Sequence, residues 1–149
     1  EELFNATMVA GAERRIKSIQ SVLTTPENVE DFKAKLRIFL HQFFENSCEN
    51  SCTIQIIARD HKIIAENESV RAYFQIIPSI IAKFFREAQE KNILKKEFDP
   101  EILVDLTFSP YFMKILFADT RLGTDLLDHE TRHRMVEQHI EIFCNGYLV

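Results

Sequence analysis

The pattern of apolar and polar residues along the chain is that of consecutive amphipathic helices. Apolar residues recur every three or four positions from Phe4 to Leu23, the spacing that places them on one face of a helix. This pattern is already present at the first residues, with no initiator Met and no cap, so we expect the chain to be the rear part of a longer protein. Thr25 followed by Pro26 predicts the N-cap and first turn of a second helix. The apolar stripe of that helix is Val29, Phe32, Leu36, Phe39 or Leu40, and Phe43.

The middle of the chain predicts a short element and then a long helix. A polar stretch over residues 45–51 ends the second helix, and Cys52 to Ile57 suits either a short helix or a short strand. A long helix is then expected to start after Asn67 or Ser69. Its apolar period continues in phase on both sides of Pro78, which favours a kink over a break.

The last third of the chain contains two further helix starts. Asp99-Pro100-Glu101 combines a capping residue, a proline and an acidic first turn, and it predicts a helix over residues 102–117 that is interrupted or bent at Ser109-Pro110. After a loop at Gly123, a final helix is expected from about Asp128. It has two adjacent apolar stripes, a face wider than one neighbour covers, which favours packing against a partner subunit. The stripes are Val136, Ile140, Phe143 and Tyr147, and Met135, His139, Ile142 and Gly146.

Composition narrows the class of protein. The 149 residues fit one domain, and 3 Gly and 4 Pro against 46% hydrophobic residues favour long helices. We therefore predict a single all-α domain over residues 1–149, an antiparallel bundle of about six helices. The net charge of -5 has the wrong sign for binding DNA phosphates. The absence of a membrane-spanning run or signal peptide, together with an odd count of three cysteines, predicts a cytoplasmic protein.

One motif suggests metal chemistry. His129-Glu130-Thr131-Arg132-His133 matches H-E-x-x-H, and His139 stands where the metzincin pattern places a third ligand. That pattern needs a glycine where this chain has Val136. In a continuous helix His139 would lie about 280° around and about 15 Å along from His129, too far to share its metal. We therefore expect the solvated start of an amphipathic helix, without a bound metal, and keep a zinc hydrolase as a lesser alternative.

Other chemical signals are weak. Cys48 and Cys52 lie four residues apart and would share a helical face near His41 and His61, so they allow a redox or metal role besides simple packing. Cys144 is expected to be packed in the core. A glycine-rich phosphate loop and a nucleophile elbow are both absent from the sequence. We therefore predict neither enzymatic activity nor a cofactor.

The layout resembles the C-terminal half of TetR/AcrR-type transcriptional regulators. The opening Glu1-Glu2-Leu3-Phe4 is similar to the stretch that follows the helix-turn-helix head in that family, and the head itself is missing. Phe98-Asp99-Pro100-Glu101 and the closing Phe143 with Gly146-Tyr147 are also similar to the family's layout. The resemblance implies a homodimer that senses a small apolar or amphipathic effector and contacts DNA only through the missing N-terminal domain. The last two helices would form the dimer interface, through Met113, Leu116, Met135, Val136, His139, Ile142, Phe143 and Gly146.

Thirteen Phe and no Trp supply large apolar surfaces, which suit an effector pocket as well as an ordinary core. Arg15 interrupts the first apolar stripe and would pair either with an anionic effector or with a carboxylate of the chain itself. The other reading of the whole chain is a helical interaction module without a ligand, its interior filled by its own side chains. The candidate effector-binding residues are Met8, Ala12, Arg15, Phe39, Phe43, Tyr73, Phe74, Ile77, Phe108, Tyr111 and Phe112.

Overall fold

The computed structural model describes residues 2–60, 62–117 and 128–149, and these residues form seven helices. No strand occurs among them, which confirms the prediction of an all-helical bundle; the one β-bridge joins Leu94 to Leu148. Gly123 and His61 lie outside the described residues. The helices are α1 (Glu2–Val22), α2 (Val29–Glu49), α3 (Ser51–Arg59), α4 (Lys62–Glu66), α5 (Glu68–Glu90), α6 (Pro100–Leu116) and α7 (His129–Tyr147).

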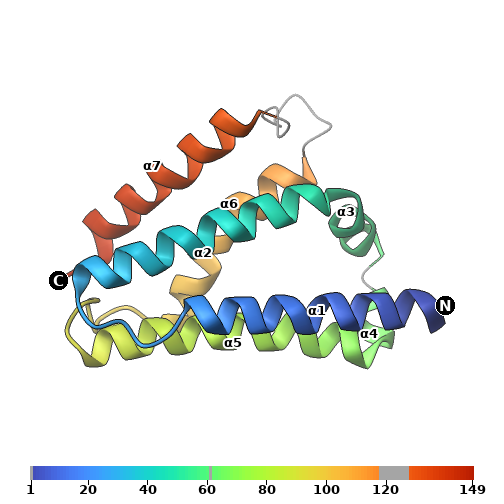
Figure 1. Cartoon of the computed structure of the whole chain (residues 1–149), viewed down its shortest axis with the longest axis horizontal. Helices are drawn as coiled ribbons and strands as arrows, with labels where there is room; N and C mark the ends of the chain where they lie inside the picture. Colours follow the sequence, from blue (N-terminus) through green and yellow to red (C-terminus); the bar gives the residue numbers. More distant parts are fainter. Residues whose placement is uncertain (1, 61, 118–127) are drawn as a thin grey trace.

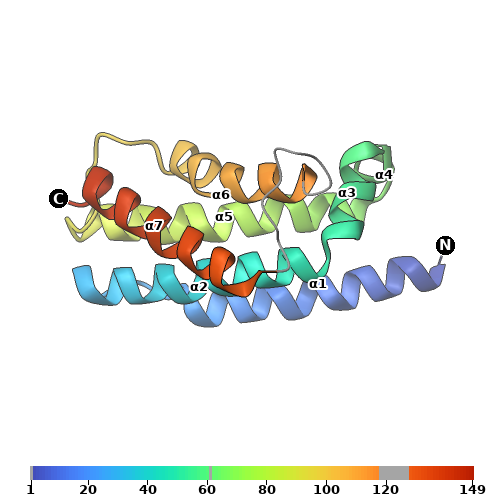
Figure 2. The ribbon, with the colours of Figure 1, turned by 90° about the horizontal axis from the view of Figure 1, so that it is seen from above.

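The long helices run roughly along one axis (Figures 1 and 2). α1 packs against α5 along one side of the molecule, and these two helices run in the same direction. α2 packs against α7, and α6 packs against α5, each pair running in opposite directions. The short helices α3 and α4 lie near one end, where α3 contacts α6 and α4 contacts α5. Among the described helices none is both long enough and apolar enough to cross a membrane.

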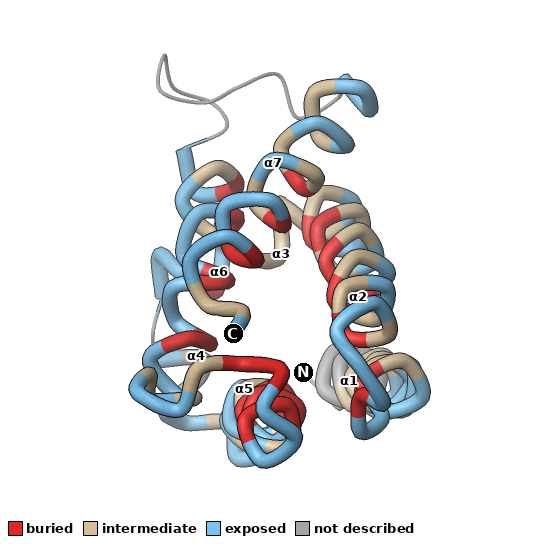
Figure 3. The backbone as a smooth tube through the Cα atoms, turned by 90° about the vertical axis from the view of Figure 1, so that its left-hand side faces the viewer, coloured by how far each residue is buried: buried red, intermediate tan, exposed pale blue. Residues whose placement is uncertain are grey.

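A phenylalanine cluster forms the centre of the core. Phe32 of α2 stacks on Phe84 of α5 with ring centroids 5.1 Å apart, and Phe85 stacks on Phe143 of α7 at 5.5 Å. All four rings are at most 2% exposed. The buried segments face inward from α2, α5, α6 and α7, while the outer faces of these helices are exposed (Figure 3). The core therefore depends on contacts between helices that are far apart in the sequence.

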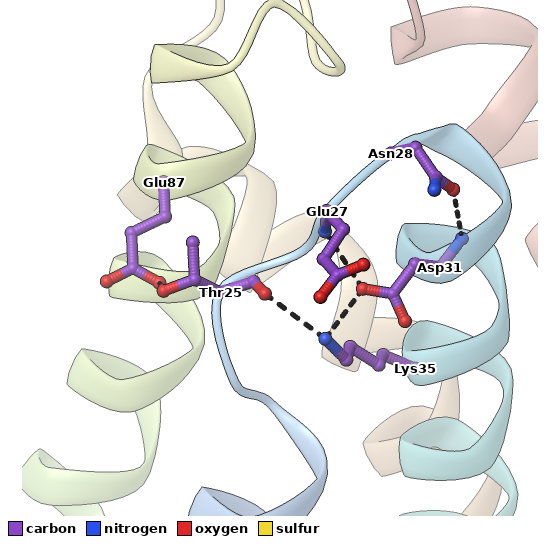
Figure 4. Close-up of polar contacts among 6 residues, drawn as sticks. All are labelled: Thr25, Glu27, Asn28, Asp31, Lys35 and Glu87. Atoms are coloured by element: carbon purple, nitrogen blue, oxygen red, sulfur yellow. Dashed lines mark hydrogen bonds and ion pairs between the residues drawn. The ribbon is translucent and has the colours of Figure 1, made fainter.

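The start of α2 differs from the prediction. The cap is Asn28, whose side chain accepts a hydrogen bond from the backbone N–H of Asp31 at 2.9 Å, so the prediction of a cap at Thr25 was wrong. Thr25 instead donates its hydroxyl hydrogen to Glu87 of α5 at 2.8 Å (Figure 4). Its carbonyl accepts from Lys35, and Pro26 is buried in the connection. Contacts to other helices thus hold Thr25-Pro26 in an extended link between α1 and α2.

The other helix boundaries agree with the sequence more closely. Asp99 caps α6 by accepting a hydrogen bond from the N–H of Glu101 at 2.8 Å. Asp128 caps α7 by accepting hydrogen bonds from the backbone N–H groups of Glu130 and Thr131. α5 continues through Pro78, as the in-phase apolar period predicts. α6 also continues through Pro110, so the alternative of an interruption there was wrong. α2 extends to Glu49, through most of the polar stretch that was expected to end it.

The segment from Cys52 to Ile57 is helical, so the alternative of a short strand was wrong. Gln55 donates from its side chain to the carbonyl of Ile115, and Ile57 is buried against the other helices. These contacts with α6 hold α3 across the end of the bundle and override the local β propensity.

Candidate functional site

A small cleft lies between α1, α2 and α5. Its volume is about 190 Å³, and four of the predicted effector-binding residues line it: Arg15, Phe39, Phe43 and Ile77. The polar side chains of Arg14, Ser18, Gln42, Asn46 and Ser47 also line the cleft. The cleft therefore combines apolar with polar and cationic groups, a combination that suits an amphipathic or anionic molecule.

The predicted aromatic residues of α6 lie behind this cleft. Phe43 makes edge-to-face contacts with Phe108 at 4.7 Å and with Phe112 at 5.9 Å, and Phe39 makes the same kind of contact with Phe108 at 5.7 Å. Tyr111 is fully buried and packs on Phe44. Phe108, Tyr111 and Phe112 therefore support the wall of the cleft from the inside, and they do not line it.

The remaining predicted pocket residues lie elsewhere on α1 and α5. Ala12 is half-buried, and Phe74 is 37% exposed. The side chains of Met8 and Tyr73 lie outside the part of the chain that the structure describes. The structure thus brings four of the eleven candidates, from α1, α2 and α5, to one opening.

A second, larger groove separates α6 from α7. It measures about 550 Å³, and its walls include Leu106 and Pro110 of α6 and Met135, His139 and Ile142 of α7. Large apolar side chains on this side of the molecule are unusually exposed: Leu106 at 52%, Met113 at 53% and Ile142 at 72%. Such a surface is typical of a protein–protein interface.

The predicted interface residues fall into two groups. Met113, Leu116 and Gly146 are exposed, and Met135, His139, Ile142 and Phe143 line the groove. Val136 and Phe143 are nevertheless only 1% and 2% exposed and lie in the core of their own chain. Phe143 packs on Phe32 of α2, so these two side chains are not available to a partner.

One hydrogen bond joins the two walls of this groove. The Tyr111 hydroxyl lies 2.7 Å from Nδ1 of His139. Burial raises the pKa of Tyr111 and lowers the pKa of His139, so both groups are held in their neutral forms. The pair has the donor and acceptor that two neutral groups need, and it links α6 to α7 across 28 residues of sequence.

The H-E-x-x-H motif does not form a metzincin arrangement among the described residues. His139 is bonded to Tyr111 of α6, whereas His133 stacks on His41 of α2 with ring centroids 4.8 Å apart. The imidazoles of His133 and His139 therefore face different neighbours. α7 is one continuous helix from His129, the condition under which His139 was expected to lie too far from His129 to share a metal.

A polar seam that the sequence analysis missed runs between α2 and α7. Glu137 accepts hydrogen bonds from Arg37 at 3.1 Å and contacts His41 Nε2 at 2.8 Å. One turn along, Arg132 donates to both carboxylate oxygens of Glu45 at 2.8 and 3.0 Å. The i,i+4 spacing of His133 and Glu137 was visible in the sequence, but their pairing with His41 depends on how α7 packs on α2.

The cysteines lie apart from both openings. Cys48 is half-buried, and burial raises the pKa of its thiol to about 11, so it is protonated at neutral pH and a poor nucleophile. Cys52 is exposed, and both thiols are free. Cys144 is buried in the core, as expected.

The arrangement thus offers a small cleft, an apolar groove and a polar seam. The groove is larger than the cleft, and two of the exposed apolar side chains of α6 and α7, Leu106 and Ile142, line it. Comparisons of the chain with protein-family models, with characterised proteins and with solved structures find no match.

Proposed function

We propose that this chain is the effector-sensing and dimerisation domain of a TetR-like transcriptional regulator. The observation that carries the proposal is the apolar surface of α6 and α7, which has no covering element among the described residues. In this proposal two copies pair through that surface, and DNA contact belongs to a helix-turn-helix head of the kind the family carries. The net charge of -5 supports leaving DNA contact to another part of such a regulator.

The spacing on α6 supports a helix-to-helix contact. Ile102, Leu106 and Met113 are separated by four and seven residues, so they lie on one face of the helix, and each is more than half exposed. Fully burying an exposed side chain of this size contributes about 1.5–3 kcal/mol, and these half-exposed side chains would each contribute about half of that. In a two-fold dimer every such residue is buried twice, so this stripe and Ile142 would both contribute to holding two copies together.

The cleft between α1, α2 and α5 is the proposed effector site. α2 forms one wall of the cleft and also packs against α7. A molecule that prefers one spacing of α1 and α2 would therefore bias the position of α7, and with it the dimer geometry. The size of that bias is limited by the difference in its affinity for the two arrangements.

Light scattering after size-exclusion chromatography tests the dimer. We expect a mass of two chains for the protein, and a mass of one chain for Leu106→Glu, because moving a carboxylate from water into an apolar contact carries a large desolvation cost. Ile56→Glu is the matched control: Ile56 is 57% exposed on α3, outside the groove, and this variant should remain dimeric. A protein that elutes as a monomer, or a Leu106→Glu variant that stays dimeric, would contradict the proposal.

A ligand-free helical interaction module is the second candidate, and the size of the cleft favours it. About 190 Å³ is below the roughly 300–1,000 Å³ of typical small-molecule sites. Native mass spectrometry of the purified chain separates the two candidates, since an organic adduct released on denaturation supports sensing. The absence of any adduct, together with no thermal shift from a panel of amphipathic anions, would favour the module.

A further inference from the structure

Three metal-ligating side chains converge between α2 and α7. His41 comes from α2, and His133 and Glu137 lie one turn apart on α7, so both point to the same neighbour. One ligand atom from each lies within 4.8 Å of the other two. His41 Nε2 is 2.8 Å from a Glu137 oxygen, and the two imidazole rings are nearly parallel, with an angle of 18° between them. From this juxtaposition we propose that His41, His133 and Glu137 bind a divalent first-row transition-metal ion such as Zn²⁺.

The ligand set suits such an ion. Two imidazole nitrogens and one carboxylate are common ligands of Zn²⁺ and its neighbours, with one or more positions left for water. Metal–ligand bonds of about 2.1 Å in a tetrahedral site place the ligand atoms about 3.3 Å apart. The ligand atoms here lie within 4.8 Å of one another, so the side chains must rotate closer together for all three to bind one ion.

The environment of Glu137 prepares its carboxylate for a cation. Its carboxylate lies between the guanidinium of Arg37 and the ring of His41. Arg37 Nε lies 3.1–3.2 Å from both oxygens. If Arg37 keeps its hydrogen bond to one oxygen of Glu137 while the ion binds the other, Arg37 orients the Glu137 carboxylate without binding the ion itself.

The cluster is also accessible. The side chains of His41 and Glu137 are 27% and 34% exposed, and His133 is exposed, so an ion can enter without opening the core. The next acidic group along the seam, Glu45, is held by both of its oxygens on Arg132 and is not available as a ligand. The site therefore consists of three protein ligands and open positions on the solvent side.

This site differs from the one that the H-E-x-x-H spacing suggests. In that reading His129 and His133 bind the ion, and His41 has no role. In the present proposal His133 is shared, His41 replaces His129, and the ion joins α7 to α2. Because the proposal rests on these three side chains alone, it stands or fails independently of the regulator function and of dimerisation.

Calorimetric titration of Zn²⁺ into the purified, metal-stripped chain tests the site. We expect one Zn²⁺ per chain. His41→Ala, His133→Ala and Glu137→Gln should each weaken binding by more than the 10–100-fold that loss of an outer-shell partner typically costs. His129→Ala is the matched control, an i,i+4 neighbour of His133 on the same helix, and it should leave the affinity unchanged.

The outcomes are separable. Loss of binding in His129→Ala together with full binding in His41→Ala would overturn the proposal in favour of the sequence motif. No binding by the unmodified chain would overturn it outright. Circular dichroism of each variant checks folding, and if His41→Ala does not fold, the near-isosteric Glu137→Gln decides. A Zn²⁺-dependent rise in the thermal midpoint of the unmodified chain, absent in Glu137→Gln, is the expected supporting result.

Discussion

Single residues in this protein are often defined by a partner on another helix. The clearest case is His139, which the sequence pattern assigns to a stripe facing a partner subunit but which the fold places against the hydroxyl of Tyr111 in the same chain. Burial makes the protonated imidazole unfavourable and lowers the pKa of His139 below its ordinary value of 6.5. Its charge state is therefore a consequence of the packing of α6 on α7.

This lowered pKa predicts a pH dependence of stability. Below about pH 6.5 the unfolded chain protonates His139 while the folded chain does not, so the free energy of unfolding should decrease as the pH falls from that value toward the folded pKa. His139→Gln, which keeps an acceptor for Tyr111 but does not titrate, should reduce the slope in urea denaturation series between pH 5 and 7. Tyr111→Phe retains the buried imidazole, and so should retain the slope. An equal slope in His139→Gln would assign the effect to another group.

At the scale of helices, capping decides where each element begins. Asp99 and Asp128 each combine a β-region backbone with a side-chain acceptor, and the following helices start where the sequence predicts. The start of α2 offers two candidate caps, Thr25 and Asn28, and only tertiary contacts separate them. The Thr25 hydroxyl donates to Glu87, and the Thr25 carbonyl accepts from Lys35 (Figure 4). Asn28 is therefore the residue that caps the helix.

Substitution at these two positions tests the start of α2. Asn28→Ala should lower the free energy of unfolding by about 1 kcal/mol, since the Asp31 amide loses its acceptor. Asn28→Asp supplies an equivalent acceptor and should be nearly neutral. Thr25→Ala removes only an exposed hydrogen bond, so its effect should be the smaller of the two alanine variants. Chemical denaturation gives the three values, and a larger loss in Thr25→Ala would place the cap there.

At the scale of the whole molecule, one aromatic cluster joins helices from all parts of the chain. Phe32 lies within 6.4 Å of Phe84, Phe85 and Phe143, measured between ring centroids. These residues belong to α2, α5 and α7, so the cluster forms only when the bundle closes. Its energy is therefore a property of the assembled fold, and no single helix contains it.

Removal of the central ring should be costly. Phe32→Ala is expected to reduce the free energy of unfolding by about 3–5 kcal/mol, because it removes a fully buried side chain and leaves a cavity. Ile38→Ala, on the same helix but 49% exposed, should change it by less than about 0.5 kcal/mol. Urea denaturation at a fixed protein concentration compares the two. Similar losses at both positions would mean that Phe32 is not the centre of the core.

The sequence predicts more of the fold than of the candidate sites. The regular spacing of apolar residues predicts the long helices, and it predicts that α5 continues through Pro78. This works because regular spacing indicates one continuous buried face. The sites depend on where separate helices meet. Phe39 and Phe108 belong to the apolar stripes of two different helices. Their contact places Phe39 on the cleft and Phe108 behind it, and neither stripe predicts that contact.

Spacing and caps within a few residues fix the local features: the helical class, most helix boundaries, and the apolar face of each helix. Which of these faces meet is fixed only when the helices pack. That packing placed Val136 in the core and left Ile142 exposed, although both lie on the apolar side of α7. It also brought His41 to His133 and Glu137, across more than 90 residues of chain. The reason is physical, because such contacts depend on helix directions and distances that no local pattern encodes.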